Sequence, residues 1–314
     1  MKQTTTRREL LAAGTSVGIL TAGLLASSAT PSMAAARPAG KAAGKTDFND
    51  PRTRFEAQVK MRGSLADGPV HTFVRLHIWG YANDGNLVPF FSMNNYSVNV
   101  WRKLENGNFA VRVYEVGVYT KFDSYDVLTE WLNPFTNEQR EVHQFRSGPL
   151  NVEFGVDGIK AGVETTVKPR PMQVELMEDS VIATTQSNFM FPSPFQPDRY
   201  PKESPGRMFF WDSFYSHVSP IAAVLDPNQP SVPTTISLTN FVSWAPWLAM
   251  SQKPGRTYGR GMGRKISGLN ALPVEVVRSI EQYTPQVIDI DKWGPPYDDI
   301  ADYKQKLDAA AAKP

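Results

Sequence analysis

Apolar and polar residues alternate along most of the chain between residues 64 and 268, and a period of two is typical of β-strands. The run His71–Tyr81 shows this most clearly, because every second side chain is apolar or small on one face: Thr72, Val74, Leu76 and Ile78. Tight-turn dipeptides separate such runs at Asp67-Gly68, Asp84-Gly85, Asn106-Gly107 and Asp157-Gly158. This pattern predicts a long antiparallel series in which Tyr96–Glu105 pairs with Phe109–Thr120.

Further strands are expected near residues 141–146, 150–155, 161–167, 172–178, 181–190, 208–218, 235–243 and 256–267. The pattern becomes helical only at the two ends of this region. Asp50 is a helix N-cap before Pro51, and Gly63 is expected to end that helix. A second helix is predicted after Pro273 and a last one after Pro295-Pro296.

A strand series of this length must protect its edges, which a closed barrel removes. The predicted fold is therefore mainly β: a single antiparallel barrel of the calycin-like, ligand-holding kind, with a two-sheet sandwich as the alternative. Short helices lie at both ends. The β domain is expected over residues 47–270 and a helical C-terminal extension over 271–314.

The N-terminus resembles an export signal. Thr6-Arg7-Arg8-Glu9-Leu10-Leu11 carries the paired arginines, Arg7 and Arg8, of a twin-arginine motif, and an uncharged stretch follows it. Residues 1–36 are the predicted signal peptide, cleaved after Ala34 or Ala36, and 37–46 a flexible leader. The twin-arginine translocase is then a partner, and the mature protein is periplasmic without a stable membrane span. The alternatives are an amphipathic first helix or a membrane anchor.

Charge and cysteine content exclude several kinds of site. The whole chain has a net charge of +2, but removing residues 1–36 leaves 30 basic and 30 acidic residues. This balance does not favour a nucleic-acid partner, which needs clustered positive charge. The chain has no cysteine, so iron–sulfur clusters, thiolate zinc sites and a cysteine nucleophile are excluded.

Several segments together resemble a bacterial family known as domain of unknown function 1838. The segments, which span about residues 47 to 270, are Val59–Leu65, Asn133–Glu138, Phe191–Pro194, Trp244–Met250, Pro254-Gly255 and Gly263–Lys265. Members of that family often carry twin-arginine signals. Position 137 is Asn where the family turn is expected to have Gly, and Asn also tolerates a left-handed conformation. The resemblance implies no catalytic residues.

The first candidate site is the second face of His71–Tyr81. Arg75 and His77 lie on it, flanked by three aromatic residues: Phe73, Trp79 and Tyr81. An aromatic pocket with these two groups suits acid–base chemistry on an oxygenated small molecule. The alternative is that this face is solvated. His71 and His77 stand about 20 Å apart on a regular strand, so they cannot share a metal ion, and no metal site is expected.

Three other segments offer candidate residues. Tyr215 and His217 share one face of a strand and form a possible proton-transfer pair, with packing as the alternative. Arg260 and Arg264 lie on one face of a glycine-rich strand, where they either bind an anion or form a solvated basic edge. Trp244 and Trp247 either wall a pocket or pack in the core.

Three functions remain open from the sequence. The first is an exported enzyme that isomerises, eliminates from or hydrolyses a small, largely apolar molecule, using His77, Arg75 and His217 without a metal or redox cofactor. The second is a periplasmic binding or carrier protein that uses the same cavity. The third is a structural protein of the cell envelope whose barrel is filled with side chains.

Overall fold

The computed structural model describes residues 47–82, 84–161 and 173–312. The predicted signal peptide and leader, with Arg7 and Arg8, therefore lie outside the described residues. The strands are β1 (Gly68–Ala82), β2 (Leu87–Lys103), β3 (Phe109–Thr120), β4 (Glu130–Leu132), β5 (Gln139–Glu141), β6 (Phe145–Gly155), β7 (Gly158–Ala161), β8 (Gln173–Met177), β9 (Ser180–Pro192), β10 (Met208–Pro220), β11 (Thr235–Val242), β12 (Gly255–Ile266) and β13 (Tyr297–Asp298).

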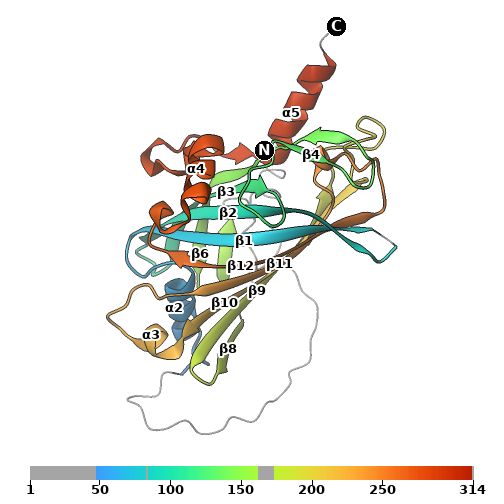
Figure 1. Ribbon diagram of the computed structural model, residues 1–314. Coiled ribbons are helices and arrows are strands. Elements are labelled where there is room, and N and C mark those ends of the chain that lie inside the picture. Colours follow the sequence, from blue (N-terminus) through green and yellow to red (C-terminus); the bar gives the residue numbers. More distant parts are fainter. Residues whose placement is uncertain (1–46, 83, 162–172, 313–314) are drawn as a thin grey trace, which may run out of the picture.

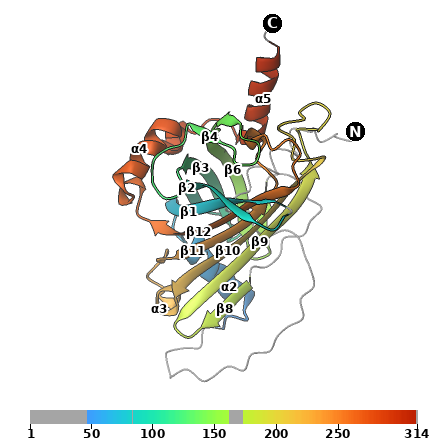
Figure 2. The same ribbon diagram turned by 45° about the vertical axis from the view of Figure 1, so that its right-hand side comes forward.

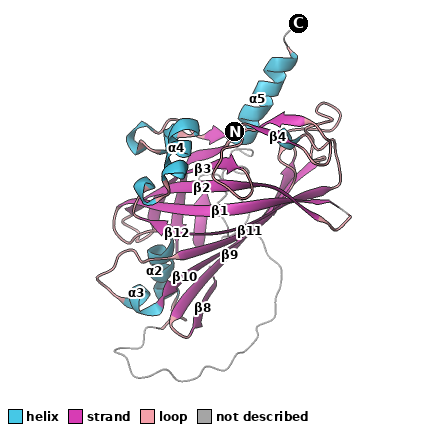
Figure 3. Cartoon of the chain, in the orientation of Figure 1, coloured by secondary structure: helices cyan, strands magenta, loops and turns pink. Residues whose placement is uncertain are grey.

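The helices are fewer and lie at the periphery of the strands (Figure 3). They are α2 (Pro51–Arg62), α3 (Ile221–Leu225), α4 (Val274–Tyr283) and α5 (Asp299–Ala311), with short 3-10 turns η1 (Pro246–Leu248), η2 (Leu269–Ala271), η3 (Pro285–Val287) and η4 (Ile290–Lys292). The expectation of a mainly β protein with short helices at both ends is confirmed.

Eleven strands form one antiparallel sheet in the order β13-β6-β3-β2-β1-β12-β11-β10-β9-β8, with β7 paired to β6. The sheet curls into a half-barrel (Figures 1 and 2). Two runs of neighbouring strands, β1, β2, β3, β6 and β7 on one side and β8 to β12 on the other, each follow the chain order, whereas β4 and β5 form a separate hairpin. A ladder of twelve residue pairs between β1 and β12, from His71–Ile266 to Ala82–Gly255, joins them into one sheet.

The curled sheet is open along one side, since within the described residues no ladder joins its two edges. Helix α2 fills this gap at one end. One side of α2 packs Phe55 and Val59 against Trp101 and the aromatic residues around it, whereas its other side packs Ala57 and Met61 against β9. In a closed barrel, hydrogen bonds between the first and last strands cover the sheet edges. Here the packing of α2 between the two edges covers them at one end.

Helix α2 begins and ends where the sequence indicates. The Asp50 carboxylate accepts a hydrogen bond from the Thr53 N–H at 2.7 Å, as an N-cap does. The helix ends at Gly63 for a packing reason rather than a conformational one. A Cβ at position 63 would lie 1.9 Å from the buried indole ring of Trp101, so only glycine lets that ring pack against the helix end.

The strands differ from expectation chiefly in length. Phe109–Thr120 is confirmed as β3, and it pairs with β2, which begins earlier than expected, at Leu87. The strand expected near 150–155 is the second half of β6, whereas residues 142–144 of the strand expected near 141–146 form a loop between β5 and β6. The turn at Asn133–Glu138 joins the short β4–β5 hairpin, and Asn137 has the left-handed φ of 56° that the turn needs. Of the strand expected near 161–167, only the first residue is described.

The C-terminal segment covers the convex face of the sheet. Val276 and Ile280 of α4 are completely buried against the outward side chains of β2 and β3. Helix α5 continues past the end of the half-barrel and projects from the molecule (Figure 1). Its first turns contact β6, η1 and β13, and further along the helix the Asp308 carboxylate accepts hydrogen bonds from Arg199 and from the Tyr200 hydroxyl.

Candidate functional site

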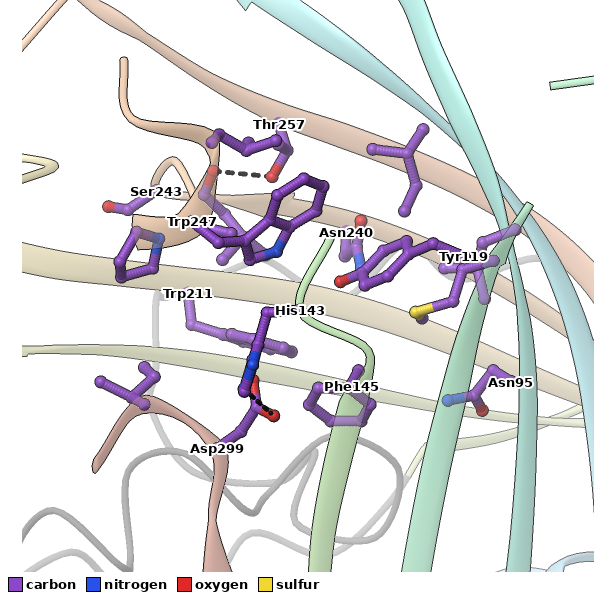
Figure 4. Close-up of a pocket in the computed structure, with 18 of the residues that line it drawn as sticks. Asn95, Tyr119, His143, Phe145, Trp211, Asn240, Ser243, Trp247, Thr257 and Asp299 are labelled. Carbon is purple, nitrogen blue, oxygen red and sulfur yellow. Dashed lines mark hydrogen bonds and ion pairs between the residues drawn. The ribbon is translucent and has the colours of Figure 1, made fainter. Parts of the chain in front are cut away.

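A cavity of about 130 Å³ opens between the concave face of the sheet, η1 and the first turn of α5. Figure 4 shows the side chains around it. Its walls are mainly aromatic and aliphatic, and the principal ring contributors are Phe91, Tyr119, Phe145, Phe209, Trp211 and Trp247. Polar side chains interrupt this wall at three places. They are Asn95 and Glu115 on β2 and β3, Asn240 on β11, and the pair His143 and Asp299 beside α5.

The buried polar group consists of Asn95 and Glu115. The Asn95 side-chain N–H donates to Glu115 Oε1 at 2.7 Å, whereas Asn95 Oδ1 accepts no hydrogen bond within the described residues. Burial raises the pKa of the Glu115 carboxyl to about 7, and the hydrogen bond from Asn95 partly offsets this rise. Near neutral pH this carboxyl can therefore either accept or donate a hydrogen bond.

Tyr215 of β10 lines the same cavity, and electrostatic interactions couple it to Glu115 and to Arg62 of α2. Burial keeps the pKa of its phenol well above the usual value, so the hydroxyl is neutral. Arg62 is fully buried and donates to Thr185 Oγ1 at 3.1 Å. Burial lowers the pKa of Arg62 to about 10, so the guanidinium remains charged behind the cavity.

His217 lies deeper than Tyr215, beside a second space too small for a ligand of more than a few atoms. Burial, together with the charges of Arg62 and Lys265, holds its pKa well below the usual value, so the imidazole is neutral. Lys265 Nζ donates to the Lys60 carbonyl, the Gly63 carbonyl and Ser231 Oγ. This ammonium therefore caps the C-terminal end of α2, which fixes the helix against the sheet.

The ion pair beside α5 joins two distant parts of the chain. His143, just after β5, places Nε2 3.1 Å from Asp299 Oδ1. The carboxylate lies at the N-terminus of α5 and also accepts from the Arg146 N–H at 3.3 Å, whereas the imidazole packs against the Tyr303 ring. The His143 and Asp299 side chains are 10% and 17% exposed, so solvent screens the pair weakly.

Asn240 of β11 projects into the cavity between Trp247 and Tyr119 (Figure 4). A glycine on the neighbouring strand makes room for it, because a Cβ at Gly259 would lie 2.1 Å from Asn240 Oδ1. Gly261 and Gly263 face inward on the same strand and allow equally close approach of β1. The alternating glycines of β12 thus mark close packing between neighbouring strands.

The structure corrects the expected position of Arg75 and His77. Both lie on the convex face of β1, so they face away from the cavity, whose β1 wall is Leu76 and Ile78. Arg75 donates to Asn94 Oδ1 and to the Ser124 carbonyl. His77 Nδ1 lies 2.9 Å from Ser92 Oγ. The inward curl of the sheet decides which face encloses space, and alternation along one strand does not reveal it.

The flanking candidates lie on this convex face too. The ring of Trp79 packs among Phe122, Tyr258 and His77, and that of Phe73 is half-buried beneath the C-terminal segment. Tyr81 is partly exposed against Phe241. Arg260 and Arg264 are exposed opposite His77 and Phe73, on the solvated side of β12. None of these side chains lines the cavity, so the structure separates them from Tyr215 and His217.

The remaining candidates lie on the concave side. Tyr215 and His217 stack with ring centroids 6.4 Å apart, and only Tyr215 borders the cavity. Trp247 walls the cavity, whereas Trp244 packs behind it in the core and donates its indole N–H to the Lys253 carbonyl. Both expected roles of this segment, wall and core, are therefore present.

Sequence reasoning missed the polar residues of the cavity: Asn95, Glu115, His143, Asn240 and Asp299. Glu115 carried a usable signal, because it is a lone acidic residue within the otherwise apolar face of Phe109–Thr120. His143 and Asp299 carried none, since a turn and a C-terminal helix bring them together. Among the described residues, no group of three or more histidine, aspartate or glutamate side chains is placed to hold a metal ion.

A family model described as "Protein of unknown function (DUF1838)" matches residues 75–301, which is more than two thirds of the chain. No curated protein matches the chain significantly. The match includes Asn95, Glu115, His143, Asn240 and Asp299.

Proposed function

The chain belongs to the DUF1838 family, and on this premise we propose that it is an exported protein that binds a small, largely apolar molecule in the cavity of its half-barrel. The observation that carries the proposal is an aromatic-walled cavity with a buried polar group, Asn95 and Glu115, in its wall. Ligand sites of proteins commonly combine such apolar walls with a few placed polar groups.

The volume limits the size of the ligand. An apolar cavity of about 150 Å³ holds benzene in a well-studied protein, so a cavity of about 130 Å³ suits a molecule built on one ring. Rings that border the space from several elements, among them Phe91, Trp211 and Trp247, favour a planar or cyclic body.

The polar groups specify the substituent. Asn95 Oδ1 is buried and accepts no hydrogen bond within the described residues, so a ligand hydroxyl would satisfy it. The Glu115 carboxyl, with its pKa raised to about 7, pairs with a ligand hydroxyl or carbonyl according to its protonation. We therefore propose a ring-sized ligand that carries at least one oxygen.

Phenol is a suitable probe, and the fluorescence of Trp211 and Trp247 reports on it directly because both rings line the cavity. Saturable binding is expected for the full chain. Leu238→Phe places extra volume in the cavity wall and should weaken binding at least tenfold. Met262→Phe, on the convex face of the adjacent strand, is the matched control and should bind as the unaltered chain does.

Absence of saturable binding for phenol, cyclohexanone and benzyl alcohol would contradict the proposal and favour a structural role for the half-barrel. Equal weakening by both phenylalanine variants would show that the ligand does not occupy the cavity. The melting temperature of each variant distinguishes a blocked cavity from an unfolded chain.

The export part of the proposal is supported by the N-terminal sequence alone. Replacing Arg7 and Arg8 with lysine should leave folded protein in the cytoplasm, because the twin-arginine translocase is its proposed partner. Cell fractionation measures this effect. Undiminished periplasmic accumulation of the double-lysine variant would contradict the twin-arginine assignment, and it would leave the ligand proposal untouched.

A further inference from the structure

His143 and Asp299 are arranged as a base and its orienting carboxylate would be. Both side chains line the cavity, and both are largely buried. Asp299 Oδ1 lies 3.1 Å from Nε2, a close contact although Nε2 makes no well-directed hydrogen bond within the described residues, and Nδ1 is the second ring nitrogen. A carboxylate beside one nitrogen favours the proton on that nitrogen, so the other nitrogen presents a lone pair.

The carboxylate is itself held in place. It begins helix α5, receives the Arg146 N–H and lies in the first turn, where the helix dipole favours negative charge. Tyr303, one turn later, packs against the imidazole. His143 lies in the loop between β5 and β6, and the end of a helix holds the carboxylate that orients it, as an acid–base group requires.

The opposite wall supplies a hydrogen-bond donor. Asn240 projects into the same cavity as His143 (Figure 4). Its amide makes no hydrogen bond within the part of the chain that the structure describes, and the missing side chain at Gly259 accommodates it. Side-chain amides stabilise the oxyanion of an enolate in the way that backbone N–H groups do.

We propose that this cavity catalyses proton transfer at a carbon next to a carbonyl group, with His143 as the base, Asn240 as the oxyanion donor and Asp299 as a positioning residue. The inference rests on the proposed function, because it assigns the chemistry of that same ligand site. Its substrate class is a ring-sized, largely apolar ketone or enone.

The step balances within the substrate and the enzyme. The C–H bond next to the carbonyl breaks, its proton passes to His143 Nδ1, and its electron pair moves into the enolate, whose oxygen accepts from Asn240. The protonated imidazole then returns the proton to the same carbon, or to the far carbon of an enone, which gives an isomer. No oxidant, reductant or second substrate is needed.

Exchange of hydrogen for deuterium tests this step without knowledge of the natural substrate. Cyclohexanone is incubated with the full chain in D₂O, and proton NMR follows loss of the signals next to the carbonyl. We expect exchange above the buffer rate. His143→Gln should reduce the enzyme-dependent rate by about 100-fold or more, and Asn240→Leu by a similar factor. His71→Gln, on the convex face, is the matched control and should retain the rate.

Two further measurements separate catalysis from a structural role. Asp299→Asn should lower the exchange rate far more than the affinity for cyclohexanone, since it disturbs orientation rather than volume. His143→Ala leaves space for a free base, so added imidazole should restore exchange in this variant alone. A purely structural ion pair would give neither result.

The outcomes distinguish this inference from the proposed function. Cyclohexanone that binds saturably but exchanges only at the buffer rate would overturn the inference and leave the binding function standing. Exchange that survives in His143→Gln would overturn it as well. Failure of any ring-sized probe to bind would overturn both.

Discussion

The two faces of the sheet carry similar residue types and differ in what surrounds them. On the convex face, Arg75 and His77 lie among aromatic rings and are held by a surface loop around Ser124. On the concave face, Arg62 from α2 lies behind Tyr215 and His217, and these groups are buried. Each face thus has an arginine, a histidine and aromatic rings, but the cavity borders only the concave one.

The curvature of the sheet, rather than its residue composition, makes the concave face a candidate site and leaves the convex face a partly exposed surface. The convex face remains partly exposed across β12 and β10, where Met262 is 61% and Phe214 is 46% exposed. The concave face excludes solvent because α2 fills one end and the inward glycines of β12 let β1 approach closely. Burial holds the pKa of His217 well below its usual value on the concave face, and it also lowers the pKa of Arg75 on the convex face.

The largest expected effect comes from adding volume on the inward face of β12. Gly261→Leu places a side chain against the Arg75 carbonyl, which lies 2.6 Å from the position of its Cβ, and should reduce the free energy of unfolding by roughly 4 kcal/mol. Met262→Leu, one residue later on the convex face, should change it by less than about 0.5 kcal/mol. Urea denaturation of both variants measures the difference, and equal losses would show that the two faces are packed alike.

The next effect concerns pH. Because burial raises the folded-state pKa of Glu115 to about 7, the native state holds an extra proton between its unfolded pKa of 4.5 and pH 7. The contribution of Glu115 to the free energy of unfolding is therefore greatest below pH 4.5. It decreases by about 3 kcal/mol as the pH rises from 4.5 to 7. Glu115→Gln should remove this slope.

The comparison of Glu115→Gln with the unaltered chain isolates one group. Lys265, whose pKa burial lowers to about 7, contributes stability that increases between pH 7 and 10.5 in both proteins, so its effect cancels. Thermal unfolding at pH 5 and pH 8 is sufficient. A stability difference between the two proteins that does not change with pH would mean that Glu115 is ionised throughout.

A smaller effect separates the two candidate histidines. His217→Ala removes a buried ring and should cost about 2 kcal/mol of unfolding free energy. His77→Ala loses its contact with Ser92 and should cost about 1 kcal/mol, with the affinity for phenol unchanged. Chemical denaturation and fluorescence titration check these values. A His77→Ala variant that folds but no longer binds phenol would return the site to the convex face.

The smallest effect is expected at Arg260, which is exposed on the convex face. Arg260→Ala should leave both unfolding free energy and ligand affinity within about 0.5 kcal/mol of the unaltered values. A titration with phenol and one denaturation curve measure both. A clear loss of affinity for phenol would contradict the position of Arg260 outside the cavity.

The sequence predicts local features of this fold well. Alternation between Phe109 and Thr120 gives β3 with its observed bounds, and the helix after Pro273 is α4 with Val276 and Ile280 buried. These features depend on nearest-neighbour chemistry: side-chain period, N-caps and turn residues. The left-handed Asn137 is of the same kind.

The sequence does not predict which face of the sheet is concave. Because the cavity lies on the concave face, the sequence does not predict which residues line the site either. Leu76 and His77 are adjacent in β1 and alternate correctly, yet only the pairing of β1 with both β2 and β12, and the direction of the curl, place Leu76 inside. The contact between His143 and Asp299 depends on where α5 docks. Both are long-range outcomes that no local pattern encodes.

The ladder that joins the two runs of strands also sets the order of events during synthesis. β1 occupies the centre of the sheet, but its partner strand begins at Gly255. The ribosome has therefore translated most of the protein before the middle of the sheet can form. Until β12 is made, the edge of β1 that pairs with it has no hydrogen-bond partner strand. Completion of the half-barrel is thus a nearly post-translational event, so a translocase that accepts folded proteins would receive this chain only after its last strands are made.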